Sequence, residues 1–229
     1  MATANTLGRR MTALSLAMAG VCFALYPAIR PFSDESTLRG AEAYATSSWL
    51  LAHSLAMIGF ILLILGMLGI TSLLRKTTAG SSGVTGLVVT WIGVGLTLPY
   101  YGAETFALRA IGREALQQKN VDLLVTLTKS TRFGEGAWFF GFGLLAIAVG
   151  TILFAIEIWR SGVLPKWSGV PLAIGFSLFF PQFYTPQPVR VGHGLVILVG
   201  CWLAAWGLLN PRMGTDGARP EKPFPNRRS

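Results

Sequence analysis

Residues 49–74 read WLLAHSLAMIGFILLILGMLGITSLL, and this stretch decides the fold class. It contains no Asp, Glu, Lys or Arg, and His53 is its single ionisable side chain. About 20 apolar residues in an α-helix cross the hydrocarbon core of a bilayer. Residues 49–74 are therefore predicted to form a transmembrane helix.

Further apolar runs lie on both sides of this stretch and extend the prediction to the whole chain. They predict an all-α integral membrane bundle of six transmembrane helices within residues 1–210, with spans at about 11–29, 49–74, 84–108, 136–157, 169–182 and 191–209. The span at 169–182 is the shortest, because Pro171 and Pro181 interrupt its run and proline breaks helices. Residues 211–229 are rich in Pro, Gly and Arg and are predicted to form a disordered basic tail.

The composition agrees with a lipid environment. Hydrophobic residues make up 52% of the 229 residues, charged residues make up 13%, and the mean hydropathy is +0.54. Soluble domains carry about 25% charged residues. The net charge is +9, and the Lys and Arg residues that cause it flank the apolar runs and lie in the tail. We therefore expect them to contact anionic lipid headgroups and not nucleic acid.

The distribution of Lys and Arg predicts the orientation. Residues 11–29 follow Arg9 and Arg10 as in a signal peptide, but no small-residue cleavage site follows directly, so we expect a retained helix. With the N-terminus inside, eleven Lys and Arg residues lie on the inner side and eight on the outer side. The chain is therefore predicted to lie in a bacterial plasma membrane with both termini cytoplasmic.

The predicted outer loop at 109–135 contains apolar residues at helical spacing, namely Leu116, Leu123, Leu124 and Leu127. This spacing predicts a short amphipathic helix that lies on the membrane surface or covers the bundle.

Ionisable side chains inside or beside spans mark functional sites in membrane proteins. The second and sixth spans run in the same direction, so His53 and His193, near their starts, are expected at similar depth on the outer side. The third span runs in the opposite direction, so Glu104, which lies late in it, is expected at the same level. Three further residues are predicted to join this layer: Arg109, Glu135 and Arg190. The alternative is structural, with helix–helix hydrogen bonds, interfacial side chains, and Glu104 paired with Arg109.

Aromatic residues concentrate at the same level. Tyr100 and Tyr101 precede Glu104 by four and three residues, so all three share a helix face. The residues predicted to shape a cavity are Trp49, Tyr100, Tyr101, Trp138, Phe139, Phe142 and Phe180. The alternative is an ordinary interfacial aromatic belt.

A carboxylic acid in an apolar pocket stays protonated near neutral pH and can protonate an alkene or epoxide. Aromatic faces then stabilise the carbocation. The sequence therefore favours a membrane-embedded enzyme that cyclises or isomerises an isoprenoid-type apolar substrate. In this hypothesis Glu104 donates the proton, and His53 or His193 sets its protonation or removes the final proton.

Three segments carry a resemblance over nearly the whole chain: YGAETFALRAIG at 101–112, WRSGVLPKWSG at 159–169, and the FPQF and GHG motifs at 180–183 and 192–194. They resemble small multi-pass membrane proteins of actinobacteria. The size and the acid among aromatics also resemble, in architecture alone, bacterial membrane-bound terpene cyclases. That resemblance implies an isoprenoid substrate and assigns no individual residue.

Two other functions stay open. His53 and His193 at matched depth are also typical of a bis-His b-haem electron-transfer protein. The broken fifth span and the outer charges also suit a non-enzymatic transporter, sensor or accessory subunit.

Several chemistries lack their motifs. The sequence has no phosphate-binding loop and no His-x-x-x-His or cysteine pair for zinc, and Cys22 and Cys201 are isolated in apolar runs. The aspartate pairs that bind magnesium diphosphate are also absent. We therefore expect no metal and no cofactor other than the alternative haem, with lipid and an apolar small molecule as partners.

Overall fold

The computed structural model describes residues 2–74, 80–162 and 164–210. Within these residues every regular element is helical, which confirms the all-α prediction. The α-helices are α1 (Ala2–Ile29), α2 (Leu38–Ala45), α3 (Ser47–Leu74), α4 (Gly80–Gly102), α5 (Leu108–Gln118), α6 (Val121–Phe133), α7 (Gly136–Ser161), α8 (Val170–Ser177) and α9 (Gln187–Leu209). A π-helical segment, η1 (Ala103–Ala107), joins α4 to α5, and the 3-10 segments η2 (Lys166–Gly169) and η3 (Pro181–Tyr184) flank α8. The predicted disordered tail at 211–229, and Arg75 and Lys76 of the orientation count, lie outside the described residues.

Within the described residues, five helical segments are long and apolar enough to cross a membrane, which indicates a membrane protein. They are Thr6–Ile29, Ser47–Leu74, Gly83–Gln118, Gly136–Ser161 and Gln187–Leu209. The predicted span at 169–182 is not among them. Here the chain forms the eight-residue helix α8, only about 12 Å long against a hydrocarbon core of about 30 Å. Pro171 lies in the first turn of this helix and Pro181 begins the η3 turn after it, so the regular helix is short where the sequence places proline.

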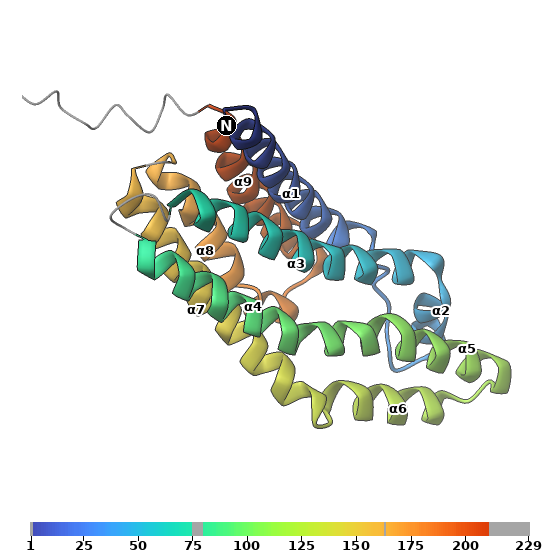
Figure 1. Ribbon diagram of the computed structural model, residues 1–229. Coiled ribbons are helices and arrows are strands. Elements are labelled where there is room, and N and C mark those ends of the chain that lie inside the picture. Colours follow the sequence, from blue (N-terminus) through green and yellow to red (C-terminus); the bar gives the residue numbers. More distant parts are fainter. Residues whose placement is uncertain (1, 75–79, 163, 211–229) are drawn as a thin grey trace, which may run out of the picture.

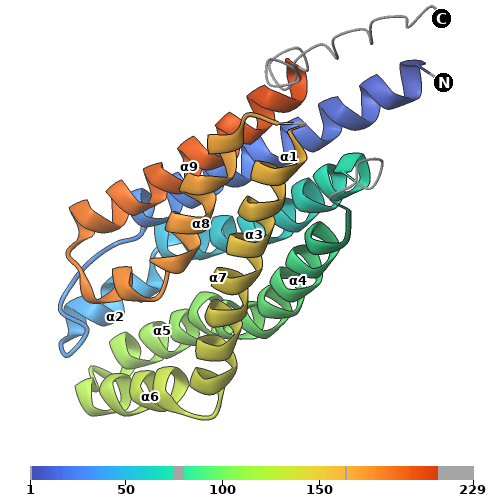
Figure 2. The same cartoon turned by 90° about the vertical axis from the view of Figure 1, so that its left-hand side faces the viewer.

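The long helices form a bundle whose two ends differ (Figure 1). In the bundle α1 packs against α3 and α9, α4 packs against α7, and α8 lies between α7 and α9. Figure 2 shows that α1 begins and α9 ends at the same end, called here the terminal end. The opposite end, the cap end, carries α2, α5 and α6, which together are called the cap.

Residues 164–186, called here the broken segment, contain η2, α8 and η3 and run antiparallel to α9 over most of their length. Gly207 lies against Pro165, Gly200 against Leu172, and Gly175 against Ile197. The segment therefore extends from the terminal end toward the cap end, although only α8 and the short η2 and η3 turns within it are helical.

Small residues allow α4 and α7 to approach closely. A Cβ atom added to Gly93 of α4 would lie 2.6 Å from the carbonyl oxygen of Gly143 in α7. One added to Gly150 would lie 2.6 Å from the backbone nitrogen of Thr90. In lipid, where apolar burial drives little association, such close backbone packing is a main source of helix–helix affinity.

The cap has its own small core. Its buried residues are Ala41, Tyr44, Trp49, Leu108, Ala115 and Leu124, and Leu116 and Leu123 pack against them. The region 109–135, predicted to contain a short amphipathic helix, thus comprises the end of a long continuous helix and α6. Leu127, predicted to share the apolar face, is 42% exposed.

Candidate functional site

Glu104 lies where α4 changes its winding at the cap end. It belongs to η1, a π-helical turn that follows Pro99 in α4, and its side chain is buried. Proline has no backbone N–H and disturbs the regular ladder, and π-turns are frequent at functional sites. The indole Nε1 of Trp49 donates a hydrogen bond of 2.7 Å to the backbone carbonyl of Glu104. The tryptophan of α3 therefore fixes the position of this turn.

The carboxylate of Glu104 is held by Arg132 of the cap. Arg132 Nε donates to Oε1 at 2.6 Å and Nη2 donates to Oε2 at 3.1 Å. Charge-assisted, bidentate contacts of this kind are among the strongest hydrogen bonds in proteins. The predicted alternative partner of Glu104, Arg109, does not take this place, because Arg132 supplies both contacts to the carboxylate.

A second carboxylate completes the cluster. Glu35, in the connection between α1 and α2, accepts hydrogen bonds from Arg132 Nη1 and Nη2. Arg30, at the end of α1, also donates to Glu35 at 3.1 Å and lies over the Trp49 ring. We call Arg30, Glu35, Glu104 and Arg132 the charged cluster. It connects α1, η1 and α6.

The charges of Glu35 and Arg132 in this cluster stabilise each other. Burial by itself would raise the pKa of Glu35, but the hydrogen bonds and charge of Arg132, with a contribution from Arg30, lower that pKa below its usual range. Burial alone would lower the pKa of Arg132, but Glu104 and Glu35 raise it above its already high value. Glu35 and Arg132 are therefore an ionised pair at neutral pH.

His53 lies beside this cluster, as the sequence predicted for His53 and Glu104. Its Nε2 is 3.7 Å from Glu104 Oε2, and its Nδ1 is 2.9 Å from the carbonyl oxygen of Trp49. The side chain is 1% exposed, and its ring packs against Trp49 and Tyr26. A proton on Nε2 would point toward the carboxylate.

His193 has different contacts from His53, and they lie in and after α8. Its Nε2 lies 2.6 Å from the carbonyl oxygen of Gly175 in α8, and its ring contacts Phe179. Axial haem ligands must present free ring nitrogens to one iron. His53 Nε2 faces Glu104 and His193 Nε2 faces the Gly175 carbonyl, so the two Nε2 atoms are directed at different partners, and the bis-His haem pair stays a prediction.

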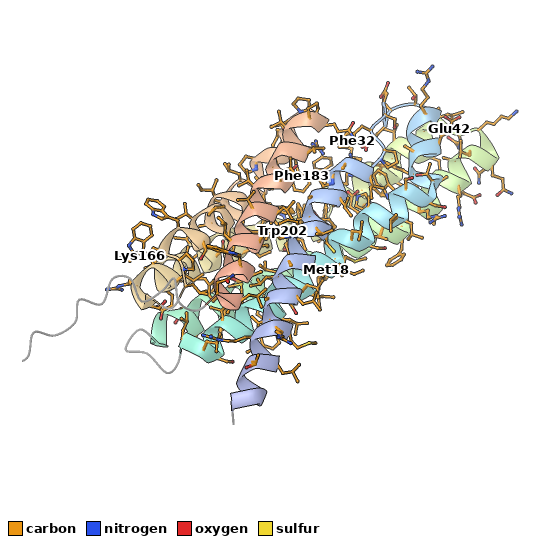
Figure 3. All side chains as sticks on the ribbon, turned by 90° about the horizontal axis from the view of Figure 1, so that it is seen from above. Met18, Phe32, Glu42, Lys166, Phe183 and Trp202 are labelled. Atoms are coloured by element: carbon orange, nitrogen blue, oxygen red, sulfur yellow. The ribbon has the colours of Figure 1, made fainter. Side chains whose placement is uncertain are left out.

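The other predicted polar residues do not join Glu104. Arg190 donates to the carbonyl oxygens of Thr185 (2.9 Å) and Phe183 and lies over the Phe32 ring. Phe32 and Phe183 both lie toward the cap end, far from Lys166 at the opposite end (Figure 3). The side chain of Glu135 is exposed at the start of α7, and that of Arg109 is half-buried on α5.

The predicted aromatic residues divide into two groups. Trp49 and Tyr101 are buried beside His53, and Tyr100 donates a 3.5 Å hydrogen bond to the Arg132 carbonyl while its ring stacks on Phe140. The second group lies apart from the charged cluster on the outer face of α7 and the broken segment: Trp138, Phe142 and Phe180 line a groove, and Phe139 is 57% exposed outside that lining.

This groove, called here the α7–α8 groove, has a volume of about 430 Å³. Its lining consists of Trp138, Gly141, Phe142, Leu144, Leu145, Ala148, Phe176, Ser177, Phe180 and Pro181. None of these side chains is ionisable, and none belongs to the charged cluster. Trp138 and Leu145 are 72% and 60% exposed, so in a bilayer the groove opens toward lipid.

Sequence reasoning missed Glu35, Arg30 and Arg132 as members of the cluster. All three lie in segments that the sequence places in loops. One signal was present for Arg132: it follows the buried residues Leu124 and Thr128 at intervals of four, on the inward face of α6.

Comparisons of this chain with protein-family models, with curated proteins and with solved structures find no match. Among the residues that the structure describes, no three His, Cys, Asp or Glu side chains gather as a metal site. The functional argument therefore comes from the geometry of the cluster and the groove.

Proposed function

We propose that this chain is a multi-pass protein of the bacterial plasma membrane that takes an isoprenoid-type apolar molecule from lipid into the α7–α8 groove. In this proposal it is a transporter, sensor or accessory subunit, and the charged cluster has a structural role. One observation carries the proposal: the groove has no ionisable lining, while the carboxylate of Glu104 is occupied by Arg132. Proton-initiated chemistry needs a neutral acid that faces its substrate.

The groove has the size and composition of a small-molecule site. Its volume of about 430 Å³ lies within the usual range of roughly 300–1,000 Å³ for ligand pockets. Trp138, Phe142, Phe176 and Phe180 offer ring faces to a flexible unsaturated chain. Entry needs no aqueous path, because the groove opens on the lipid side of the bundle.

The broken segment beside α9 is, in this proposal, a sixth crossing of the membrane. It runs from the terminal end to the cap end, and its irregular backbone packs between α7 and α9, where a membrane protein tolerates a break. Six crossings place the start of α1 and the end of α9 on one side, in agreement with the predicted cytoplasmic location of both termini.

A photoreactive fifteen-carbon isoprenoid hydrocarbon tests the binding proposal in membranes that contain the protein. We expect crosslinks at residues 138–148 and 176–181 and recovery of the uncrosslinked probe unchanged. Ala148→Trp places a large side chain in the groove and should abolish the crosslinks. The matched control Val149→Trp changes an adjacent residue outside the lining, 45% exposed, and should leave them intact. Crosslinks that are insensitive to Ala148→Trp would overturn the proposal.

A second candidate function is the acid-catalysed cyclisation or isomerisation of an isoprenoid-type substrate. The observation in its favour is the 3.7 Å approach of His53 Nε2 to Glu104 Oε2 at a π-helical turn, which suits proton transfer between the two. Membranes with the wild-type protein or Glu104→Gln are supplied with prenylated substrates, and products are analysed. A product formed by the wild-type protein and lost in Glu104→Gln supports catalysis. Equal conversion excludes Glu104 as the proton donor, and no conversion by either rejects this candidate.

A further inference from the structure

The backbone at the end of α8 has hydrogen-bonding groups without backbone partners. In a continuous helix the carbonyl of Ser177 would accept from the N–H of residue 181, but residue 181 is proline and has none. The neighbouring groups are paired: Leu178 N–H donates to Ile174 at 3.0 Å, and Gln182 N–H donates to Leu178 at 3.0 Å. Within the part of the chain that the structure describes, the Ser177 carbonyl and the Phe180 N–H form no backbone hydrogen bond.

The residues that carry these groups line the α7–α8 groove. Ser177, Phe180 and Pro181 all belong to its lining, and the Ser177 hydroxyl adds a third polar group. The rest of the lining is aromatic or aliphatic, apart from Gly141. In the proposed crossing an unsatisfied backbone group is unfavourable in hydrocarbon, so an occupant that bonds to it is favoured. The groove is therefore an apolar site with one polar position.

The chemistry of that position selects the end group of the occupant. A hydroxyl can donate to the Ser177 carbonyl and accept from the Phe180 N–H, whereas a hydrocarbon can do neither. A diphosphate would need cations, and the lining contains no Lys, Arg or His. The polar position thus fits an uncharged end group that is both donor and acceptor.

Resting on the proposed binding function, we propose that the α7–α8 groove binds an isoprenoid alcohol, with its chain among the rings of Trp138, Phe142 and Phe180 and its hydroxyl at the break between Ser177 and Pro181. Pro181 has a specific role in this site: by lacking an N–H it leaves the Ser177 carbonyl free for the ligand.

Competition against the photoreactive hydrocarbon tests this assignment on the full-length protein in phosphatidylcholine nanodiscs. The competitors are a fifteen-carbon isoprenoid alcohol, the same chain with hydrogen in place of the hydroxyl, and its diphosphate. We expect the alcohol to displace the probe at about tenfold lower concentration than the hydrocarbon, as one to two net hydrogen bonds would give. The diphosphate should compete no better than the hydrocarbon.

Two variants distinguish the contribution of the Ser177 carbonyl to alcohol binding from that of the Ser177 hydroxyl. Pro181→Ala supplies an N–H for the Ser177 carbonyl and should weaken alcohol binding by about threefold with no change for the hydrocarbon. Ser177→Ala removes only the hydroxyl and should have a similar or smaller effect. Pro188→Ala, at the exposed start of α9 outside the lining, should change neither.

The outcomes distinguish the two proposals. Equal competition by alcohol and hydrocarbon, or an alcohol preference that survives both Pro181→Ala and Ser177→Ala, overturns the alcohol assignment and leaves the binding function in place. Stronger competition by the diphosphate also overturns it. Failure of all three competitors, together with absent crosslinks, rejects the binding function itself. If Pro181→Ala does not fold, Ser177→Ala and the three competitors still decide.

Discussion

Arg132 and Glu104 are 28 residues apart in sequence, yet the guanidinium of one donates two hydrogen bonds to the carboxylate of the other, at 2.6 and 3.1 Å. Arg132 lies on α6 of the cap and Glu104 lies in the π-turn at the end of α4. Both side chains are less than one-fifth exposed. This pair therefore fixes the cap on the membrane helices.

Arg132→Leu should destabilise the protein strongly. The substitution leaves Glu104 buried without its cation, and removal of one partner of a buried pair costs about 3–5 kcal/mol. Thermal unfolding in detergent micelles, followed by circular dichroism, measures the loss. Arg113→Leu makes the same substitution at an exposed position of α5 and should stay within about 0.5 kcal/mol of the wild-type protein.

The double variant Arg132→Leu/Glu104→Leu should recover much of this loss, because no unpaired charge then remains at Glu104 and Arg30 still pairs with Glu35. Additive losses from the two single variants would mean that the two side chains do not act together.

The stability of the protein should depend on acid pH through Glu35. Because Arg132 and Arg30 hold its folded-state pKa below the ordinary 4.5, Glu35 contributes stability that is fully present above about pH 4.5. That contribution is lost as pH falls through the lowered pKa, where the carboxyl takes up a proton. The melting temperature of the wild-type protein should therefore exceed that of Glu35→Gln at pH 7, and the difference should shrink as the pH falls below about 4.5.

A matched variant at an exposed glutamate distinguishes the pH effect of Glu35 from that of other carboxylates. Glu42 is exposed on α2, and Glu42→Gln should follow the wild-type profile throughout. A constant gap between the wild-type protein and Glu35→Gln at all pH values would show that Glu35 does not contribute through its charge.

Gly93→Ala should weaken the packing of α4 on α7. The new methyl group would lie 2.6 Å from the Gly143 carbonyl oxygen and 2.7 Å from the Ile147 nitrogen, both backbone atoms that cannot turn away. Overpacking of this kind costs about 1–3 kcal/mol. Gly95→Ala, two residues along the same helix, meets no atom within 4 Å and should be neutral or slightly stabilising. Melting temperatures in micelles compare the two, and equal values would contradict the close contact.

The lengths of the apolar runs predicted the long helices well, because the length of such a run can be read from the local sequence without any knowledge of packing. They did not predict that only eight residues of 169–182 form the helix α8, because the proline positions were visible but the length of α8 depends on packing against α7 and α9. The approach of His53 to Glu104 followed from counting helix directions. The Arg132–Glu104 pair depends on how α6 folds back over the membrane helices, and no local pattern encodes that turn. The same limit explains why Trp138 and Phe142 were expected beside Glu104 although they line a separate groove.

Reporter fusions should place both ends of the described chain on the cytoplasmic side if the broken segment is a crossing. The start of α1 and the end of α9 lie at the same end of the bundle, and in the proposed topology the segment through α8 crosses the membrane between α7 and α9. Green fluorescent protein joined before residue 2 or after residue 210 should fluoresce, because it folds in the cytoplasm. Alkaline phosphatase joined after Lys119, between α5 and α6, should be active, because it folds only outside. Phosphatase activity after residue 210, with fluorescence retained at the N-terminus, would mean that only five segments cross and that α8 returns to the side from which it enters.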